Sequence, residues 1–134
     1  MQLEALAGQA SSAANGITLP LQHDGAVWLA DWSPLLPMLM SHERSPCVRA
    51  ADFHASLAKM LCAQARQVRQ EQGVHRVGLA GGVFQNRLLA RHAIDSLHAA
   101  GFEVLLPKRL PVNDAAISFG QIVEAQAVMA RDGM

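Results

Sequence analysis

The sequence predicts an α/β fold from the order and the length of its apolar patterns. In its second half a short strand-like stretch, a helical stretch, another strand-like stretch and a final helical stretch follow one another. The composition agrees with a packed domain, because 51% of the 134 residues are hydrophobic and only 16% are charged. We therefore expect residues 1–134 to form one domain, or one lobe of a larger one.

The chain opens with a predicted short helix and a predicted hairpin. Residues 1–10 (MQLEALAGQA) have the composition of a short helix, and the stretch SSAANG after them ends it. Residues 17–22 (ITLPLQ) and 26–32 (AVWLADW) read as two strands, with HDG between them as the turn.

Two further helices are predicted before the middle of the chain. Residues 33–40 (SPLLPMLM) indicate a brief helix, with Ser33 as a candidate N-cap and Pro34 in the first turn. The longest helical signal runs from residue 45 to Gly73, which closes it. Its apolar residues recur every three or four positions, at Phe53, Leu57, Leu61, Ala65 and Val68.

The second half predicts two parallel strands joined by a helix. Residues 75–80 read as a short strand of the buried type, residues 86–100 as a helix that ends at Gly101, and residues 102–106 as the second strand. A last helix begins at Asn113 or Asp114. The glycine turn after the first strand and the loop before Asp114 should then lie at the carboxyl ends of the strands, where ligands of open α/β sheets usually bind.

The turn at Gly81 and Gly82 has two interpretations from spacing alone. A glycine pair between a strand and a helix can serve only to let the chain turn tightly. It can also turn backbone N–H groups and a helix N-terminus toward a phosphate or nucleoside. Neither of the established phosphate-loop patterns, GxGxxG and GxxxxGK[ST], is present. Asn86 adds a polar group at the helix start, for which capping alone would account.

Asp114 also has two interpretations. A carboxylate at a helix start stabilises the exposed N–H groups and the helix dipole. A single carboxylate at the mouth of an α/β cleft can instead hold Mg²⁺ or another divalent ion beside a phosphate.

The remaining chemistry-bearing residues form no self-contained catalytic centre. The six histidines have no tight metal spacing, and His54 beside Phe53 is best explained by hydrogen-bonded packing. Eleven basic residues balance eleven acidic ones, which argues against a generally basic nucleic-acid surface. No apolar run approaches the roughly 20 residues needed to cross a bilayer, and the opening lacks the features of a secretory signal, so we expect a cytoplasmic protein.

Three stretches taken together are more specific than any one of them. They are LEALA at 3–7, ADFHASLAKML at 51–61 and the block from VGLAGGVFQN to DAAISFGQ at 77–121. In this order and spacing they resemble the C-terminal end of the HypF family of hydrogenase maturation factors, which are carbamoyltransferases. The resemblance covers nearly the whole chain.

The resemblance implies a fold and a pathway. The fold would be one lobe of an ATP-binding domain of the actin, Hsp70 and sugar-kinase kind, an RNase H-like α/β lobe with a mixed sheet and flanking helices. Full-length members convert carbamoyl phosphate and ATP into a carbamoyl-adenylate and transfer the carbamoyl group to the C-terminal cysteine of a partner, HypE. Dehydration there gives the thiocyanate that supplies cyanide ligands to the iron of [NiFe] hydrogenase.

Five residues match the family's nucleotide side. Gly81, Gly82 and Asn86 match its turn, Asn113 accompanies the acidic residue, and Asp114 matches an aspartate that ligates a metal, of the Mg or the Fe/Zn type, near the phosphates.

The chain also departs from the family pattern. Ala80 stands where the family usually has serine, and Ala115 and Ala116 replace a glycine pair, which would make positive φ angles costly there. The family's N-terminal modules are absent from these residues, so we expect the isolated chain to be inactive and to self-associate through its uncovered face. A non-catalytic nucleotide-binding or subunit-contact module and a relative of the tRNA threonylcarbamoyl-transferases remain as alternatives.

Overall fold

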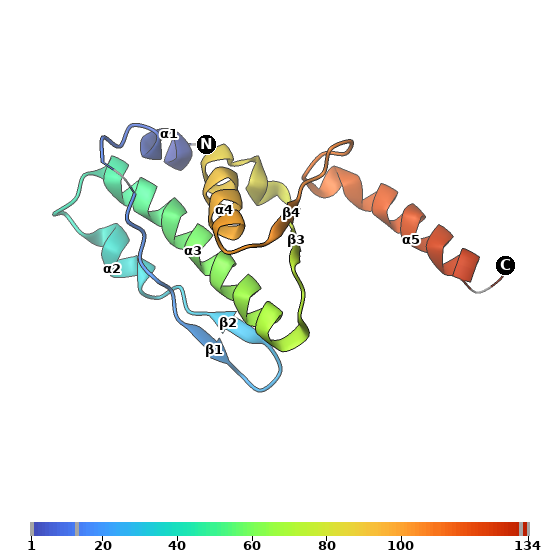
Figure 1. The fold of residues 1–134 in the computed structure, drawn as a ribbon. Helices are drawn as coiled ribbons and strands as arrows, with labels where there is room; N and C mark the ends of the chain where they lie inside the picture. The colour runs from blue at the N-terminus through green and yellow to red at the C-terminus, as the bar shows by residue number, and fades with distance from the viewer. Residues whose placement is uncertain (1, 13, 132, 134) are drawn as a thin grey trace.

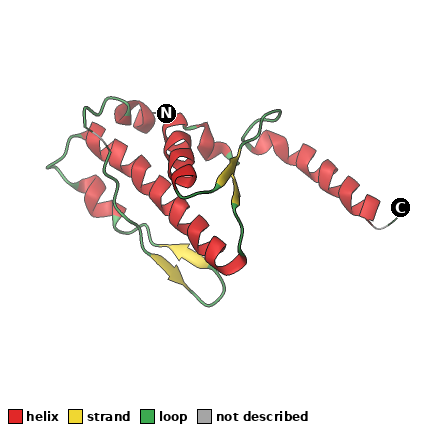
Figure 2. Ribbon diagram, viewed as in Figure 1, coloured by secondary structure: helices red, strands yellow, loops and turns green. Residues whose placement is uncertain are grey.

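The long helix α3 (Pro46–Gln72) is the element on which most of the chain packs. The computed structural model describes residues 2–12, 14–131 and 133. In it, α1 (Gln2–Ala7) and α4 (Arg87–Ala99) both lie against α3 (Figure 1). Two small sheets accompany these helices, which confirms the α/β class (Figure 2).

The bounds of α3 follow from its end residues. Ser45 accepts a hydrogen bond from the Val48 N–H at 3.4 Å, and Pro46 occupies the first turn, where a missing N–H is tolerated. Gly73 has a φ of 69°, and its N–H donates to the Arg69 carbonyl at 2.9 Å. The predicted end of this helix at Gly73 is thus confirmed.

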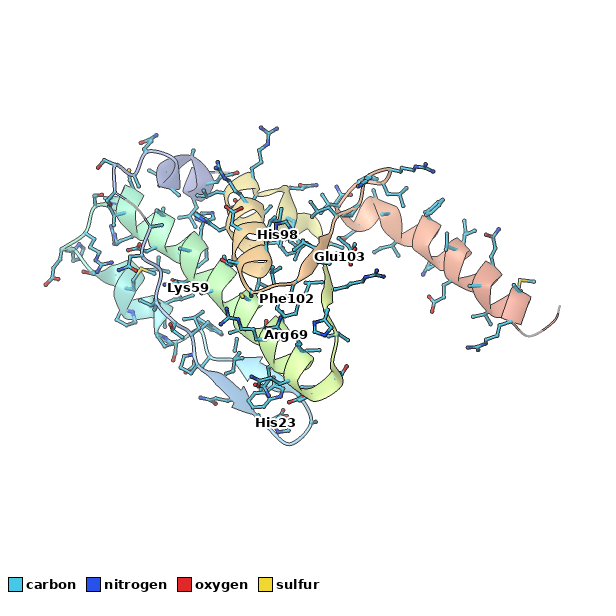
Figure 3. All side chains as sticks on the ribbon, viewed as in Figure 1. His23, Lys59, Arg69, His98, Phe102 and Glu103 are labelled. Carbon is cyan, nitrogen blue, oxygen red and sulfur yellow. The ribbon has the colours of Figure 1, made fainter. Side chains whose placement is uncertain are left out.

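The core lies mainly between α3 and α4. Small side chains let these two helices approach closely, and larger ones from the neighbouring loops and strands close the ends. The buried residues of this core are Ala58, Cys62, Leu79, Leu89, Ala93, Leu97 and Phe102. The guanidinium carbon of Arg69 lies 4.2 Å from the centroid of the Phe102 ring, and Arg69 donates to the Ala100 carbonyl at 2.8 Å (Figure 3).

The predicted parallel strands are present as β3 (Arg76–Gly78) and β4 (Glu103–Leu105), with α4 between them in the chain. The prediction of a buried-type strand at 75–80 was wrong, because Arg76 and Gly78 are exposed. In this two-stranded sheet only the middle residues, Val77 and Val104, pack against the core. The outer residues face solvent, where Arg76 pairs with Glu103 at 2.7 Å.

The predicted hairpin is also confirmed, in a shorter form. Strands β1 (Leu21–His23) and β2 (Trp28–Ala30) pair antiparallel in a sheet separate from β3 and β4. Pro20 has no N–H to donate, although its carbonyl still accepts the Asp31 N–H at 2.9 Å. The regular ladder therefore begins only after Pro20.

Helix α2 (Leu35–Met40) follows the hairpin, and the prediction of Ser33 as its N-cap was wrong. The cap position is held by Pro34, without a side-chain hydrogen bond. The Ser33 N–H instead donates to the Asp31 carboxylate at 2.9 Å, so that Ser33 belongs to the turn before the helix.

The chain ends in α5 (Ile117–Arg131), which extends away from the other helices (Figure 1). The 3₁₀ turn η2 (Asp114–Ala116) precedes it, so the predicted start at Asn113 or Asp114 is helical but of the 3₁₀ type, and the α-helix itself begins at Ile117. No residue of α5 is buried, although many of its side chains are apolar. Among the described residues, no helix is both long enough and apolar enough for a transmembrane span.

Candidate functional site

The glycine turn and the acidic loop lie next to each other. The Gly81 N–H donates to the Val112 carbonyl at 2.6 Å, one residue before Asn113. A Cβ atom placed on Gly82 would lie 4.0 Å from the Cβ of Asn113. Residues 81–82 and 113–114, more than 30 positions apart in the chain, are therefore neighbours in space.

The parallel strands produce this proximity. Since β3 and β4 run in the same direction, their carboxyl ends meet at one edge of the sheet. The ladder continues by one hydrogen bond beyond the strands, from the Leu79 N–H to the Leu105 carbonyl at 3.0 Å. Both segments leave the sheet at this edge.

A hollow of about 430 Å³, which we call the Asp114 hollow, lies between these two segments. Its walls are mainly apolar, and Asp114 is the only ionisable residue among the described residues that line it. The lining residues are Ala80, Gly81, Pro107, Leu110, Pro111, Val112, Asn113, Asp114, Ala116 and Ile117.

The backbone conformation explains the glycine at position 81 but not the glycine at position 82. Gly81 has φ 107° and ψ 154°, a conformation that side chains rarely adopt, so the tight turn by itself explains this glycine. Gly82 begins the 3₁₀ helix η1 (Gly82–Gln85), has no positive φ, and would accommodate a Cβ at ordinary contact distance. Neither torsion nor packing within the described residues demands a glycine at position 82.

Asn113 and Asp114 have different surroundings. The Asn113 side chain accepts a hydrogen bond from the Ala115 N–H at 3.2 Å and so caps η2. The Asp114 side chain is exposed, and among the described residues it makes no hydrogen bond or ion pair. Its carboxylate oxygens are thus available to a ligand.

The alanines that depart from the family pattern fit the backbone without strain. Ala115 and Ala116 lie in the 3₁₀ turn η2, and none of the described non-glycine residues has a positive φ. The expected cost of positive φ at these positions is therefore absent. Ala80 and Ala116 do line the Asp114 hollow, where Ala80 lacks the hydroxyl of a serine and Ala116 adds a methyl group relative to glycine.

Asn86 faces a different hollow. Its Oδ1 accepts from the Leu89 N–H at 3.0 Å, and its Nδ2 lies 2.7 Å from Nε2 of His54, so both ends of the amide are engaged within the chain. It lines a hollow of about 500 Å³, the Glu4 hollow, with Glu4, Gly82, Val83, Gln85 and Arg87. A Cβ added to Gly82 would also lie 4.0 Å from the Cβ of Asn113, which lines the Asp114 hollow.

The N-terminus of α4 is occupied by a carboxylate from α1, which sequence reasoning missed. Glu4 Oε1 accepts from the Arg87 N–H at 2.7 Å and lies 3.4 Å from the Leu88 N–H. Together with the Asn86 cap, it engages the first N–H groups of the helix, so this helix end is already neutralised. The partners are 83 positions apart, and no local pattern announces such a contact.

His54 is buried under the same turn, as its predicted packing role requires. It is 1% exposed, and its Nδ1 lies 2.7 Å from the Ala50 carbonyl. A carbonyl can only accept, so Nδ1 carries the proton and Nε2 accepts from the Asn86 amide.

The described residues fit a Mg²⁺ site better than a site of the Fe or Zn type. Among the described residues, no group of three His, Cys, Asp or Glu side chains could hold a metal ion. A site of the Fe or Zn type built by this chain alone is therefore not supported. Mg²⁺ is commonly bound through one or two carboxylates together with phosphates and water, and Asp114 with its unengaged oxygens fits that pattern.

Comparison with known proteins gives a consistent result. The family model described as "Carbamoyltransferase, Kae1-like Domain, second subdomain" matches residues 1–121. The carbamoyltransferase HypF of Synechocystis sp. is 39% identical over 94 residues, which are 69% of this chain and 12% of that protein. The HypF of Rhizobium leguminosarum bv. viciae is 32% identical over 133 residues, which are 98% of this chain and 17% of that protein.

The fold has a close counterpart among solved structures. The crystal structure of a full-length HypF in its phosphate- and nucleotide-bound form superposes with a TM-score of 0.83 at 30% identity. The match covers 96% of this chain and 17% of that one. The chain thus corresponds to less than a fifth of the length of these relatives.

Proposed function

Because the chain belongs to the HypF family of carbamoyltransferases, we propose that it forms one wall of an ATP and carbamoyl-adenylate site in hydrogenase maturation. In this proposal residues 1–134 are one lobe of a Kae1-like domain, and the remainder of a HypF-like chain supplies the opposite wall. The acceptor would be the C-terminal cysteine of a HypE-like protein, and we further propose a cytoplasmic location.

One observation carries the assignment of the site. The hydrogen bond from Gly81 to Val112 holds the glycine turn against the acidic loop at the carboxyl edge of β3 and β4. This edge is the usual ligand position in α/β sheets. The unexplained glycine at position 82 and the unengaged carboxylate of Asp114 lie on the two sides of this contact.

Each residue would have a distinct task. The backbone at half-buried Gly81 and exposed Gly82 would approach the phosphates, where a side chain would reduce the space. Asp114 would bind the divalent ion, whose contribution when bound is to neutralise phosphate charge. Asn113 would hold the Asp114 loop in shape, and Asn86 would support the turn from beneath.

The chemistry assigned to the whole protein has three steps. Water first cleaves carbamoyl phosphate into carbamate and inorganic phosphate, and a carbamate oxygen then attacks the α-phosphorus of ATP, which forms carbamoyl-AMP and releases pyrophosphate. The thiolate of the acceptor cysteine then attacks the carbamoyl carbon and AMP leaves. This lobe would contribute electrostatic stabilisation and positioning to the second and third steps.

A chimera provides the test. We suggest replacing the matching segment of the Synechocystis relative with this chain and measuring release of pyrophosphate that depends on carbamoyl phosphate. Asp114→Asn and Gly82→Val should each lower kcat/KM by at least about tenfold, the lower end of losses seen when metal-site groups are changed. Asp95→Asn, at an exposed carboxylate on α4, is the matched control and should leave turnover unchanged. Full turnover in the two site variants would refute the assignment.

A non-catalytic contact module is the second candidate. The exposed apolar helix α5 and the alanines at positions 80 and 116 favour it. This second candidate would be supported if the chimera folds but shows no turnover, while the native Synechocystis protein is active under the same conditions. The isolated chain should transfer no carbamoyl group under either reading.

A further inference from the structure

We propose that His54 is a positioning residue that fixes the glycine turn of the candidate site through Asn86. The inference rests on the proposed function insofar as the turn is a wall of the ATP site. The bond between His54 and Asn86 joins the buried face of α3 to the N-terminus of α4 and is itself independent of any ligand.

The hydrogen bonds fix the tautomer of His54 and the orientation of the Asn86 amide. The Ala50 carbonyl can only accept, so Nδ1 of His54 donates and Nε2 must accept. Nδ2 of Asn86 donates to it at 2.7 Å, which places the amide oxygen toward the Leu89 N–H at 3.0 Å. Rotation of the amide by half a turn would lose both bonds at once.

Asn86 passes this constraint to the turn. Its backbone N–H donates to the Val83 carbonyl at 3.1 Å, and the Phe84 N–H donates to the Gly81 carbonyl at 3.1 Å. The Gly81 N–H in turn reaches Val112 at 2.6 Å. A continuous series of backbone hydrogen bonds and short covalent segments thus links buried His54 to the acidic loop.

If packing were the only role of position 54, an apolar side chain would be sufficient there. Burying an imidazole at 1% exposure is unfavourable unless both nitrogens are bonded, as they are here. A leucine would remove that requirement and leave the Asn86 amide without its partner. The choice of histidine is therefore explained by what it holds and not by the volume it fills.

The test uses two variants at position 54 and one matched control. His54→Leu removes the acceptor, whereas His54→Gln can place its amide oxygen near the former Nε2. Ser56→Ala is the control, because Ser56 is also buried on α3 but its hydroxyl bonds Asp52 and Ile17, away from the turn. Wild-type imidazole ¹⁵N shifts should report a protonated Nδ1 and an unprotonated Nε2.

Amide hydrogen exchange in the 134-residue chain measures the effect on the turn. Relative to the core amide of Ala58, the Gly81 and Asn86 amides should exchange about tenfold faster in His54→Leu, the scale of one lost hydrogen bond. His54→Gln should restore most of the protection, and Ser56→Ala should leave the ratio unchanged. Equal ratios in His54→Leu and Ser56→Ala would overturn the proposal.

The chimera then connects the turn to catalysis. His54→Leu should raise the KM for ATP by about tenfold, matching the exchange effect, and Ser56→Ala should not. Unchanged kinetics in a His54→Leu protein with a loosened turn would also overturn the positioning role. If the wild-type chimera shows no turnover, the proposed function fails, and the exchange ratio alone decides whether His54 fixes the turn.

Discussion

Three buried polar side chains on α3 show how single residues organise this chain. Asp52 and Ser56 fix the segment before the hairpin, since Asp52 accepts from the Asn15 N–H at 2.7 Å and Ser56 from the Ile17 N–H at 2.9 Å. Asp52 also pairs with Arg44 at 2.6 Å. The third, His54, supports the glycine turn on another side of the helix. Each of these three side chains therefore has a hydrogen-bond partner in a distant segment of the chain.

Gly16 lies where this segment touches α3 most closely. A Cβ atom there would lie 2.3 Å from the Ser56 nitrogen and 2.6 Å from the Ala55 carbonyl carbon, both backbone atoms that cannot move aside. Lys59 also donates to the Gly16 carbonyl (Figure 3 shows Lys59 on this face of α3).

We expect Gly16→Ala to lower the free energy of unfolding by about 1–3 kcal/mol, the usual range for overpacking. Urea denaturation followed by circular dichroism would measure it. Gly8→Ala is the control, because its new Cβ would meet only ordinary contacts at 3.6 Å. It should change stability by less than about 0.5 kcal/mol. Similar stabilities for the two variants would contradict the close approach at Gly16.

At the scale of elements, the β1–β2 hairpin depends on its turn. The Asp24 carboxylate accepts from the Ala26 and Val27 N–H groups, each at 2.9 Å. These bonds, that from Val27 first, hold the pKa of Asp24 below its ordinary value of 3.8. They stabilise the charged form of a fully exposed group.

The sign of the pH dependence follows from this lowered pKa. The stabilisation of the turn is complete above the pKa of the unfolded chain and is lost as pH falls through the lower pKa of the folded hairpin. We expect the Ala26 and Val27 amide shifts to titrate with a midpoint below 3.8. Asp24→Asn should abolish this titration step, and a midpoint at or above 3.8 would argue against the two bonds.

Helices were more predictable from the sequence than strands. The apolar period and Gly73 located α3, and the glycine turn with Asn86 located the start of α4. Strand lengths depend on pairing with distant segments, so the three-residue strands could not be read from local pattern. Parallel order at least predicted correctly that the Gly81 turn and the Asp114 loop would meet.

The parts of the site that escaped prediction involve long-range contacts. Nothing near Glu4 in the sequence indicates that it caps a helix 83 positions later. The local sequence pattern does not indicate the pairing of His54 with Asn86 either, because the two residues are 32 positions apart. It indicated only a buried, hydrogen-bonded histidine. The use of Asn86 as a cap was among the sequence interpretations, and the cap itself is present.

At the scale of the whole molecule, α5 is the least covered element. Its exposed large apolar side chains are Ile117, Phe119, Ile122, Val123, Val128 and Met129. A helix that is apolar on several sides usually belongs inside a larger protein. The uncovered helix is consistent with a chain that matches only part of its relatives.

We therefore expect the isolated chain to self-associate through α5. Replacing Phe119 and Ile122 by glutamate should raise the dissociation constant of self-association by at least about tenfold, because each removed side chain contributes roughly 1.5–3 kcal/mol when buried. Sedimentation equilibrium would measure it. Gln121→Glu with Gln126→Glu adds the same charge to the same helix without removing apolar surface, and should have a smaller effect. A wild-type chain that is monomeric at high concentration would contradict the expectation.

The contact of Glu4 with the start of α4 has a practical consequence for anyone who shortens or tags this polypeptide. A boundary drawn after Ala7 would discard only a few residues, yet it would strip the Arg87 N–H of its carboxylate and remove Ala7 from the small cluster it forms with Ala50 and Ala51. The damage would surface beside the glycine turn, far along the sequence from the cut. A loss of function in a trimmed version would then reflect the missing Glu4 contact, and it would not argue against the residues of the Asp114 hollow.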